Sequence, residues 1–215
     1  MILGLMVGLS LCAQTPPSKD VPAIELKGMP ARVAPTEYQA HAQAGKLTVA
    51  AEFLGHSVPT PDGTYLAEDY VVVEAALFGP ADARTMLATG DFSLRINGKK
   101  VALPSQPYEL VFHSLKDPEW EPSTKDKSKT TSLNTGGGGG PNDPGSGPPP
   151  PPKMPIELRR AMEQHVQRVS MLEGERPLPQ AGLVFFDYRG KIQSIHSLEL
   201  IYSGAGGNTT LALQP

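Results

Sequence analysis

The sequence predicts a mainly β protein: an antiparallel β-sandwich of about eight strands, with one inserted α-helix and a long disordered loop. Apolar residues alternate with polar ones in several short runs. An Asn-Gly pair at 97–98 lies between two such runs. A glycine- and proline-rich stretch is followed by apolar residues at helical spacing. Many short strands joined by hairpin-length turns are typical of a sandwich.

The first residues predict export from the cytoplasm. Residues 1–13 form an apolar run that is too short to span a bilayer but has the length of a signal-peptide core, and Ala13 provides a small residue for cleavage. No Lys or Arg precedes the run, so the start codon lies upstream or the signal is atypical. Cys12, the single cysteine, stands where a lipoprotein carries its acylated cysteine, but Leu11 replaces the small residue that processing needs. We expect a periplasmic or secreted protein, with a lipid anchor at Cys12 as the less favoured alternative.

The segment before the insert predicts several strands in order. Residues 14–45 are rich in Pro, Ala and Gln and predict a flexible leader with a short edge strand at 23–26. Period-two alternation predicts a strand at 46–53. Two prolines and a glycine predict a loop at 58–63. The run 70–78 is almost wholly apolar, which predicts a central strand covered on both faces.

The clearest local signal is a hairpin within residues 91–103. Phe92, Leu94 and Ile96 alternate up to the Asn-Gly pair, and Val101 and Leu103 alternate away from it. Both central positions of the favoured two-residue turn need φ > 0, which Asn and Gly tolerate. A further strand is predicted at 108–112.

Residues 121–154 predict a disordered insert. They show no apolar periodicity and include five consecutive glycines and five consecutive prolines. Such a stretch cannot bury enough apolar surface to offset its conformational entropy. We therefore expect the insert to interrupt one domain, made of residues 46–120 and 155–215.

Deletion of residues 122–152 is expected to leave the melting temperature almost unchanged, because the predicted insert contributes nothing to the core. Differential scanning calorimetry of the full chain and the deletion variant measures the difference. A large fall in melting temperature would contradict the predicted disorder.

The segment after the insert predicts a helix followed by three strands. Apolar residues recur at helical spacing between 155 and 172, at Leu158, Met162, Val166 and Val169. Strands are then predicted at 183–188, 192–202 and 209–213, with turns between them. Three strands alone are marginal in water. They are therefore expected to complete the sheets begun before the insert.

Two segments resemble a known family. Glu68 to Phe78, followed by Asp91 to Lys99, is similar to the immunoglobulin-like domains of unknown function on secreted bacterial proteins and lipoproteins. In that family a late Gly-Leu-Val-Phe-Phe strand, here Gly182 to Phe186, leads into a strand like Ser197 to Tyr202. The resemblance covers about 130 residues. It implies an immunoglobulin-like sandwich in an extracytoplasmic setting and supplies no catalytic residues, while the insert and the helix depart from the compact family form.

Ionisable residues do not form a recognisable metal motif. The histidines stand singly, without the spacing or the cysteine partner of a zinc site. We expect His165 and His196 to be structural and partly exposed. Asp62, Glu68 and Asp69 flank one loop and carry oxygens suited to calcium, but their spacing matches no EF-hand. The simpler interpretation is that they are charges at the entrance of a strand.

Nucleophile, phosphate and partner motifs are equally weak. Ser203 lacks the first glycine of a hydrolase elbow, and the glycine-rich turn 204–208 has neither the Lys nor the helix of a phosphate loop. Phe185, Phe186 and Tyr188 place aromatic side chains on both faces of one strand; they could serve binding, but we expect them to be core on both sides. The proline run at 148–152 is preorganised for an aromatic groove, but such a run is more often a spacer. We predict no catalytic residue, no cofactor and no metal.

The sequence bounds the function without naming it. The net charge of −3 and a pI near 6.0 give no electrostatic reason to expect nucleic acid or an anionic membrane as a partner, and no integral membrane span is predicted. The leading hypothesis is a non-catalytic envelope or secreted module that binds an unknown protein or a cell-wall polymer. A structural or assembly subunit of a secreted or envelope complex is the second hypothesis, and an enzyme is the third.

Overall fold

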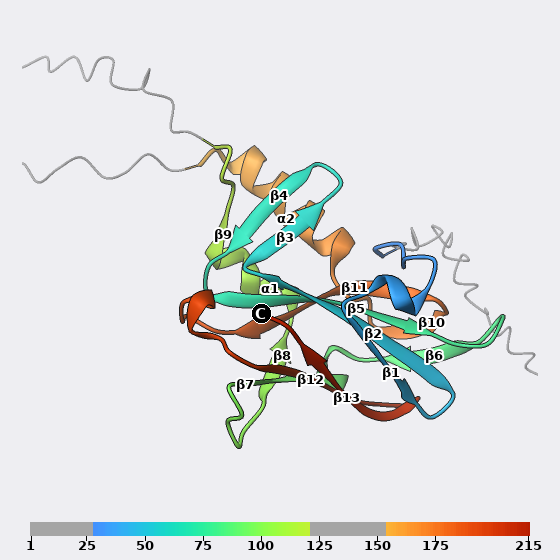
Figure 1. Cartoon of the computed structure of the whole chain (residues 1–215). Coiled ribbons are helices and arrows are strands. Elements are labelled where there is room, and N and C mark those ends of the chain that lie inside the picture. Colours follow the sequence, from blue (N-terminus) through green and yellow to red (C-terminus); the bar gives the residue numbers. More distant parts are fainter. Residues whose placement is uncertain (1–27, 121–153) are drawn as a thin grey trace, which may run out of the picture.

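A computed structural model describes residues 28–120 and 154–215, and in this part the chain is mainly β with antiparallel pairing (Figure 1). Eight strands form one sheet in the order β1-β2-β5-β11-β8-β7-β12-β13. Their bounds are β1 (Ala40–Ala44), β2 (Leu47–Gly55), β5 (Tyr70–Phe78), β7 (Phe92–Ile96), β8 (Leu103–Gln106), β11 (Gln180–Asp187), β12 (Leu198–Gly204) and β13 (Gly207–Leu213). The predicted signal peptide, Cys12, the edge strand at 23–26 and nearly all of the insert lie outside the described residues.

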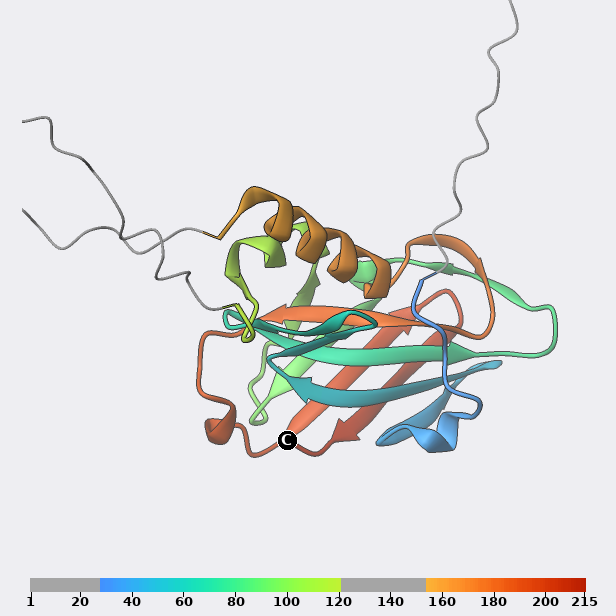
Figure 2. The same cartoon turned by 90° about the horizontal axis from the view of Figure 1, so that it is seen from above.

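The large sheet curves until its two end strands meet, which makes it nearly a barrel (Figure 2). β1 and β13 lie against each other, and Gln39 Nε2 donates to the Gln214 carbonyl oxygen at 2.8 Å across the seam. Within the described residues no backbone ladder joins β1 to β13. The mainly β class with antiparallel sheets is confirmed.

The immunoglobulin-like sandwich is not confirmed, because the two halves of the sheet are continuous. β8 pairs with β11 on one side, with Gln106 opposite Phe185, and with β7 on the other, with Leu103 opposite Leu94. In a sandwich of two separate sheets this link would be missing. By pairing with both β11 and β7, the short strand β8 joins what would otherwise be two packed sheets into one curved sheet.

The inside of the curved sheet is filled by apolar side chains. Val71, Val73, Ala75 and Leu77 of β5 all point inward, as the period of two requires. They pack with a cluster of large buried side chains from β7, β11 and β12: Phe92, Leu94, Val184, Phe186, Leu198, Leu200 and Tyr202. The interior is a packed core of the kind that fills small barrels.

A second apolar layer covers the outer face of the same strands. It consists of the helix α2 (Ile156–Val169) and the hairpin of β3 (Ser57–Thr60) and β4 (Gly63–Ala67), and α2 lies across the sheet in Figure 2. Val72 and Phe185 point outward and are buried against Met162 and Val166 of the helix. The prediction that Phe185 and Phe186 are core on opposite faces is confirmed, with 1% and 0% of each residue exposed.

The predicted flexible leader is wrong for residues 28–45. These residues form a 3-10 turn, η1 (Pro35–Glu37), and strand β1. Tyr38 is buried against the small side chains Ala50, Ala76 and Ala181 on the outer face of the sheet. The alternation of β1 is carried mainly by alanine, which is a weak strand former, so the pattern gave little signal.

The predicted loop at 58–63 is instead the β3–β4 hairpin, whose turn ends at Gly63 with φ of 142°. Pro59 is tolerated because β3 is an edge strand of the three-stranded sheet β3-β4-β9, where β9 is Leu115–Lys116. An edge strand does not need every backbone N–H for pairing.

One predicted strand, 108–112, is wrong, and another, 192–202, is wrong in its first part, whereas residues 198–202 lie in β12. Residues 108–112 form the helical turn α1 (Tyr108–Val111), which continues as η3 (Phe112–Ser114). Tyr108 and Phe112 lie one helical turn apart and their rings pack with centroids 5.7 Å apart. The start of the predicted strand 192–202 is η5 (Ile192–Ser194), closed by a hydrogen bond from Ile195 N to the Ile192 carbonyl oxygen.

The remaining described elements are short. β6 (Arg84–Leu87) pairs with β10 (Gly174–Pro177) in a two-stranded ribbon, and η2 (Thr89–Asp91) precedes β7. None of the helices in the described ranges is long and apolar enough to cross a membrane.

Candidate functional site

Among the residues that the structure describes, the most deeply buried charge is Glu74, and it is neutralised by Arg32. The Glu74 side chain is 4% exposed, and its Oε2 accepts from Arg32 Nη2 at 2.9 Å. Arg32 Nη1 also contacts Glu52 Oε2 at 2.5 Å, and the guanidinium lies 4.4 Å from the ring centre of Tyr38. These contacts fasten residues 28–39 across the outer face of the sheet. We call this segment the N-terminal strap.

His165 of α2 links the helix to the β3–β4 hairpin. Its Nδ1 lies 2.8 Å from the Tyr65 hydroxyl, and its Nε2 lies 3.3 Å from Asp62 Oδ2. Burial, together with the charges of Asp117 and Asp62, raises the pKa of Tyr65, so the phenol keeps its proton at neutral pH. A protonated phenol is a hydrogen-bond donor and a poor nucleophile. We therefore assign the contact to packing of the helix on the hairpin.

The three acidic residues considered for calcium do not converge. Asp62 faces His165, Glu68 pairs with Lys116, and the backbone oxygen of Asp69 accepts from Tyr188 N at 2.8 Å. Within residues 28–120 and 154–215 no group of three or more His, Cys, Asp or Glu side chains is placed to hold a metal ion. The glycine-rich turn after Ser203 closes the β12–β13 hairpin, with Gly204 opposite Gly207.

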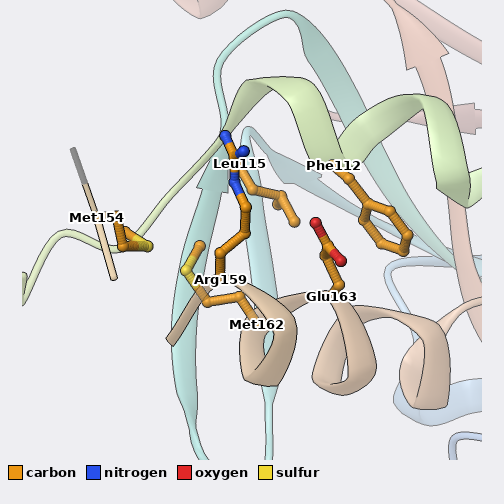
Figure 3. Close-up of a pocket in the computed structure, with 6 residues that line it drawn as sticks. All are labelled: Phe112, Leu115, Met154, Arg159, Met162 and Glu163. Carbon is orange, nitrogen blue, oxygen red and sulfur yellow. The ribbon is translucent and has the colours of Figure 1, made fainter. Parts of the chain in front are cut away.

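A small hollow lies between α2 and the β9 region (Figure 3). Arg159 and Glu163, one helical turn apart, line it with Phe112 and Leu115, and the Glu163 carboxylate points toward Phe112 in Figure 3. Its volume is about 70 Å³. Small-molecule pockets usually measure about 300 to 1,000 Å³, so this hollow is large enough only for water.

A larger groove of about 370 Å³ is acidic. Tyr108, Met171 and Leu172 supply its apolar walls, and Glu109 and Glu173 its charges. The Glu173 carboxylate is already committed, because it accepts the Thr89 backbone N–H at 2.9 Å, and hydrogen bonds from the Thr89 side chain and backbone lower its pKa. The Glu173 carboxylate is therefore already used within the protein.

A second groove of about 350 Å³ is basic and lies between the β7–β8 loop and the β11–β12 loop. We call it the basic groove. Its apolar lining comes from Ile96, Val101, Leu103 and Tyr188, and its charged lining from Lys99, Asp187 and Arg189. Lys100 and Lys191 are exposed on the same two loops. These loops carry four cations against one carboxylate, whereas the whole chain has a net charge of −3.

Asn97 ties the two walls of the basic groove together. Its Nδ2 donates to the Ser194 carbonyl oxygen at 2.8 Å, and its Oδ1 accepts from the backbone N–H groups of His196 and Ser197 at 2.7 and 3.2 Å. Asn97 and Gly98 both have positive φ, 53° and 63°, as the Asn-Gly turn predicts. The same residue thus forms the turn and anchors the opposite loop.

Tyr188 forms a fixed aromatic wall of the groove. Its hydroxyl lies 2.8 Å from Ser194 Oγ, and its ring lies so close to Gly190 that a Cβ there would be 2.5 Å from the ring carbon Cζ. Both walls are therefore held by contacts within the protein.

Asn97→Gly is expected to lower the free energy of unfolding by about 1 to 2 kcal/mol, because three partly exposed hydrogen bonds are lost, each with a net contribution near or below 1 kcal/mol. Glycine keeps the positive φ of the turn, so the backbone is not strained. Urea unfolding measures the loss. Asn97→Asp retains the acceptor and should lose less. Equal stability of Asn97→Gly and the parent protein would contradict these bonds.

No family model, curated protein or solved structure matches the chain. The candidate site therefore depends on the geometry of this protein alone.

The basic groove was not predicted from the sequence. Lys99 follows the Asn-Gly turn and Arg189 lies in the turn after the strand of Phe185 and Phe186, in separate halves of the chain. The usable signal was the clustering of cations in both turns, Lys99 with Lys100 and Arg189 with Lys191. It is weak because exposed turns often carry lysine.

Proposed function

We propose that this chain is a non-catalytic binding module that acts outside the cytoplasm of a bacterium, with the basic groove as its binding site. The observation that carries the proposal is a preformed groove whose walls are joined by Asn97, whose aromatic side chain Tyr188 is held by Ser194, and whose charge is opposite to that of the whole chain. A preorganised site binds at a lower entropic cost. The ligand classes are those expected from the sequence: another protein or a cell-wall polymer.

The distribution of ionisable groups supports binding over catalysis. Acid–base or nucleophilic chemistry needs such groups within hydrogen-bond reach of one another beside a pocket. Here Glu74, beneath the N-terminal strap, and His165, between helix and hairpin, line none of the three hollows described above. The ionisable side chains that do line them are partly or fully exposed, and among these described residues the one ion pair is the 3.9 Å contact between Arg189 and Asp187. We also retain the proposed relationship to immunoglobulin-like domains of secreted proteins, on the segments that become β5 and β7.

NMR spectra of the ¹⁵N-labelled protein test the proposal. Soluble peptidoglycan fragments and a pool of random peptides are added separately, and amide shifts are mapped onto the sequence. Shifts at residues 96–103 and 187–191 with either class support a binding module. Shifts confined to other regions, or none with either class, would overturn the groove as its site.

The oligomeric state distinguishes the second hypothesis, a structural or assembly subunit, from a binding module. Size-exclusion chromatography with light scattering is run over a wide range of protein concentration. A monomer at every concentration excludes self-assembly, and a mass that rises with concentration favours it.

A further inference from the structure

We propose that the basic groove binds an acidic peptide segment of a partner protein. One large apolar side chain of the peptide would lie between Val101 and Tyr188, and flanking carboxylates would contact Lys99 and Arg189. This inference rests on the proposed function and names the chemical class of its ligand.

Uncommitted cations provide the first argument. Several cations elsewhere on the surface are paired: Arg95 with Glu199 at 2.7 Å, Lys116 with Glu68, and Arg84 with Glu175. Lys99, Lys100 and Lys191 have no ion-pair partner among the described residues, and Arg189 has only a 3.9 Å contact with Asp187. An excess of three positive charges on two loops of an acidic chain favours an anionic partner.

The apolar lining provides the second argument. Val101 is 78% exposed, although most large apolar side chains of the described residues are buried or half-buried. Together with Leu103, the buried Ile96 and the half-buried Tyr188, it lines a volume of about 350 Å³. Cations alone would suit any anion, such as free phosphate. An apolar lining flanked by cations favours an anion that also carries an apolar group.

The concave shape favours a peptide over an anionic membrane. A membrane-binding loop inserts protruding apolar side chains among the headgroups. In the basic groove three of the four apolar residues, Ile96, Leu103 and Tyr188, are buried or half-buried, and only Val101 protrudes. A single inserted side chain fits this arrangement, with carboxylates on either side matching the positions of the cations. An extended peptide can present one apolar side chain to the groove and carboxylates on either side of it at the same time.

The test uses the full chain and the synthetic peptide acetyl-Glu-Glu-Phe-Glu-Glu-amide, followed by ¹⁵N NMR. We expect shifts at residues 96–103 and 187–191. The double variant Lys99→Glu/Arg189→Glu should weaken binding by about tenfold or more, because attraction is replaced by repulsion. Raising salt from about 50 to about 500 mM should also weaken it, since exposed charges are screened.

Two control variants separate the contributions. Lys46→Glu/Arg160→Glu makes the same change in total charge at two exposed positions outside the groove and should bind like the parent protein. Val101→Ser removes an exposed apolar contact without opening the core, and should weaken binding of the Phe peptide by about threefold. This is less than the roughly tenfold or more that one methylene group is worth in an enclosed pocket, because Val101 is 78% exposed.

Several outcomes overturn the inference. These are unchanged binding by Lys99→Glu/Arg189→Glu, equal binding of the peptide with Ala in place of Phe, equal binding of the all-Lys peptide, and stronger binding of phosphatidylglycerol vesicles. Shifts with peptidoglycan fragments but not with the acidic peptide would reject this inference while the proposed binding function stands. Failure of every ligand class would reject both.

Discussion

Phe185→Ala is expected to lower the free energy of unfolding by about 3 to 5 kcal/mol, the range measured for buried Phe→Ala substitutions. The ring is 1% exposed and lies between the sheet and α2, beside Val72, Met162 and Val166. Its removal takes away apolar burial and leaves a cavity at the junction of two layers, where the sheet is too stiff to collapse into the space. Guanidinium unfolding, monitored by circular dichroism, measures the loss.

Two controls define this result. Phe185→Leu keeps most of the volume and should cost less than about 1.5 kcal/mol. Val33→Ala removes an apolar group that is 93% exposed and should lie within about 0.5 kcal/mol of the parent protein. A loss below about 1 kcal/mol for Phe185→Ala would show that this ring is not part of the core, and it would contradict the packing of α2 on β11.

Arg32→Met is expected to destabilise the protein by about 3 kcal/mol, because it leaves the buried Glu74 carboxylate without its cation. Methionine keeps an apolar side chain at this position, while the guanidinium that lies over the Tyr38 ring is removed. The loss lies at the lower end of the usual range, since the Arg32 side chain is 30% exposed and water reaches the site. The Glu74 side chain is only 4% exposed, and its Oε1 has no hydrogen-bond partner among the described atoms. Chemical denaturation at neutral pH gives the value.

Arg95→Met is the matched control. Arg95 is 35% exposed and pairs with Glu199 at 2.7 Å, but that carboxylate is 42% exposed and is resolvated when the pair is broken. The expected loss is below about 1 kcal/mol. The double variant Arg32→Met/Glu74→Gln should recover most of the stability lost in Arg32→Met, because the uncompensated charge is gone. Equal losses for Arg32→Met and Arg95→Met would contradict the burial of Glu74.

The predicted elements that hold are those whose own residues carry a complete pattern. The apolar run at 70–78 coincides with β5, and the helical spacing of Met162, Val166 and Val169 coincides with the buried face of α2. The predicted turn at Asn97 and Gly98 has the expected positive φ at both residues. The second strand of that predicted hairpin is displaced, because β8 begins at Leu103 and Val101 lies outside it with 78% of its surface exposed. For each element that holds, the deciding feature is alternation, helical period or a local φ preference, and each of these depends on only a few consecutive residues.

The predictions that fail are those in which a distant contact decides the local structure. Tyr108 to Phe112 has the composition of a strand, but its rings pack on each other as a helical turn, and Gln167 of α2 donates to the Tyr108 hydroxyl at 3.0 Å. The N-terminal strap has little periodicity of its own. It is ordered by Arg32 and Tyr38, whose partners lie on β2, β5 and β11.

The sequence by itself determined that the chain is mainly β, which runs are strands buried on both faces, where the helix lies and which turn carries positive φ, because alternation, helical period and turn chemistry act over a few residues. Only the tertiary structure decided that β8 joins the two halves into one curved sheet, that Arg32 neutralises a buried glutamate, and that cations from two remote turns line one groove. These features depend on which surfaces meet when the whole core is buried, and local spacing contains no information about that choice.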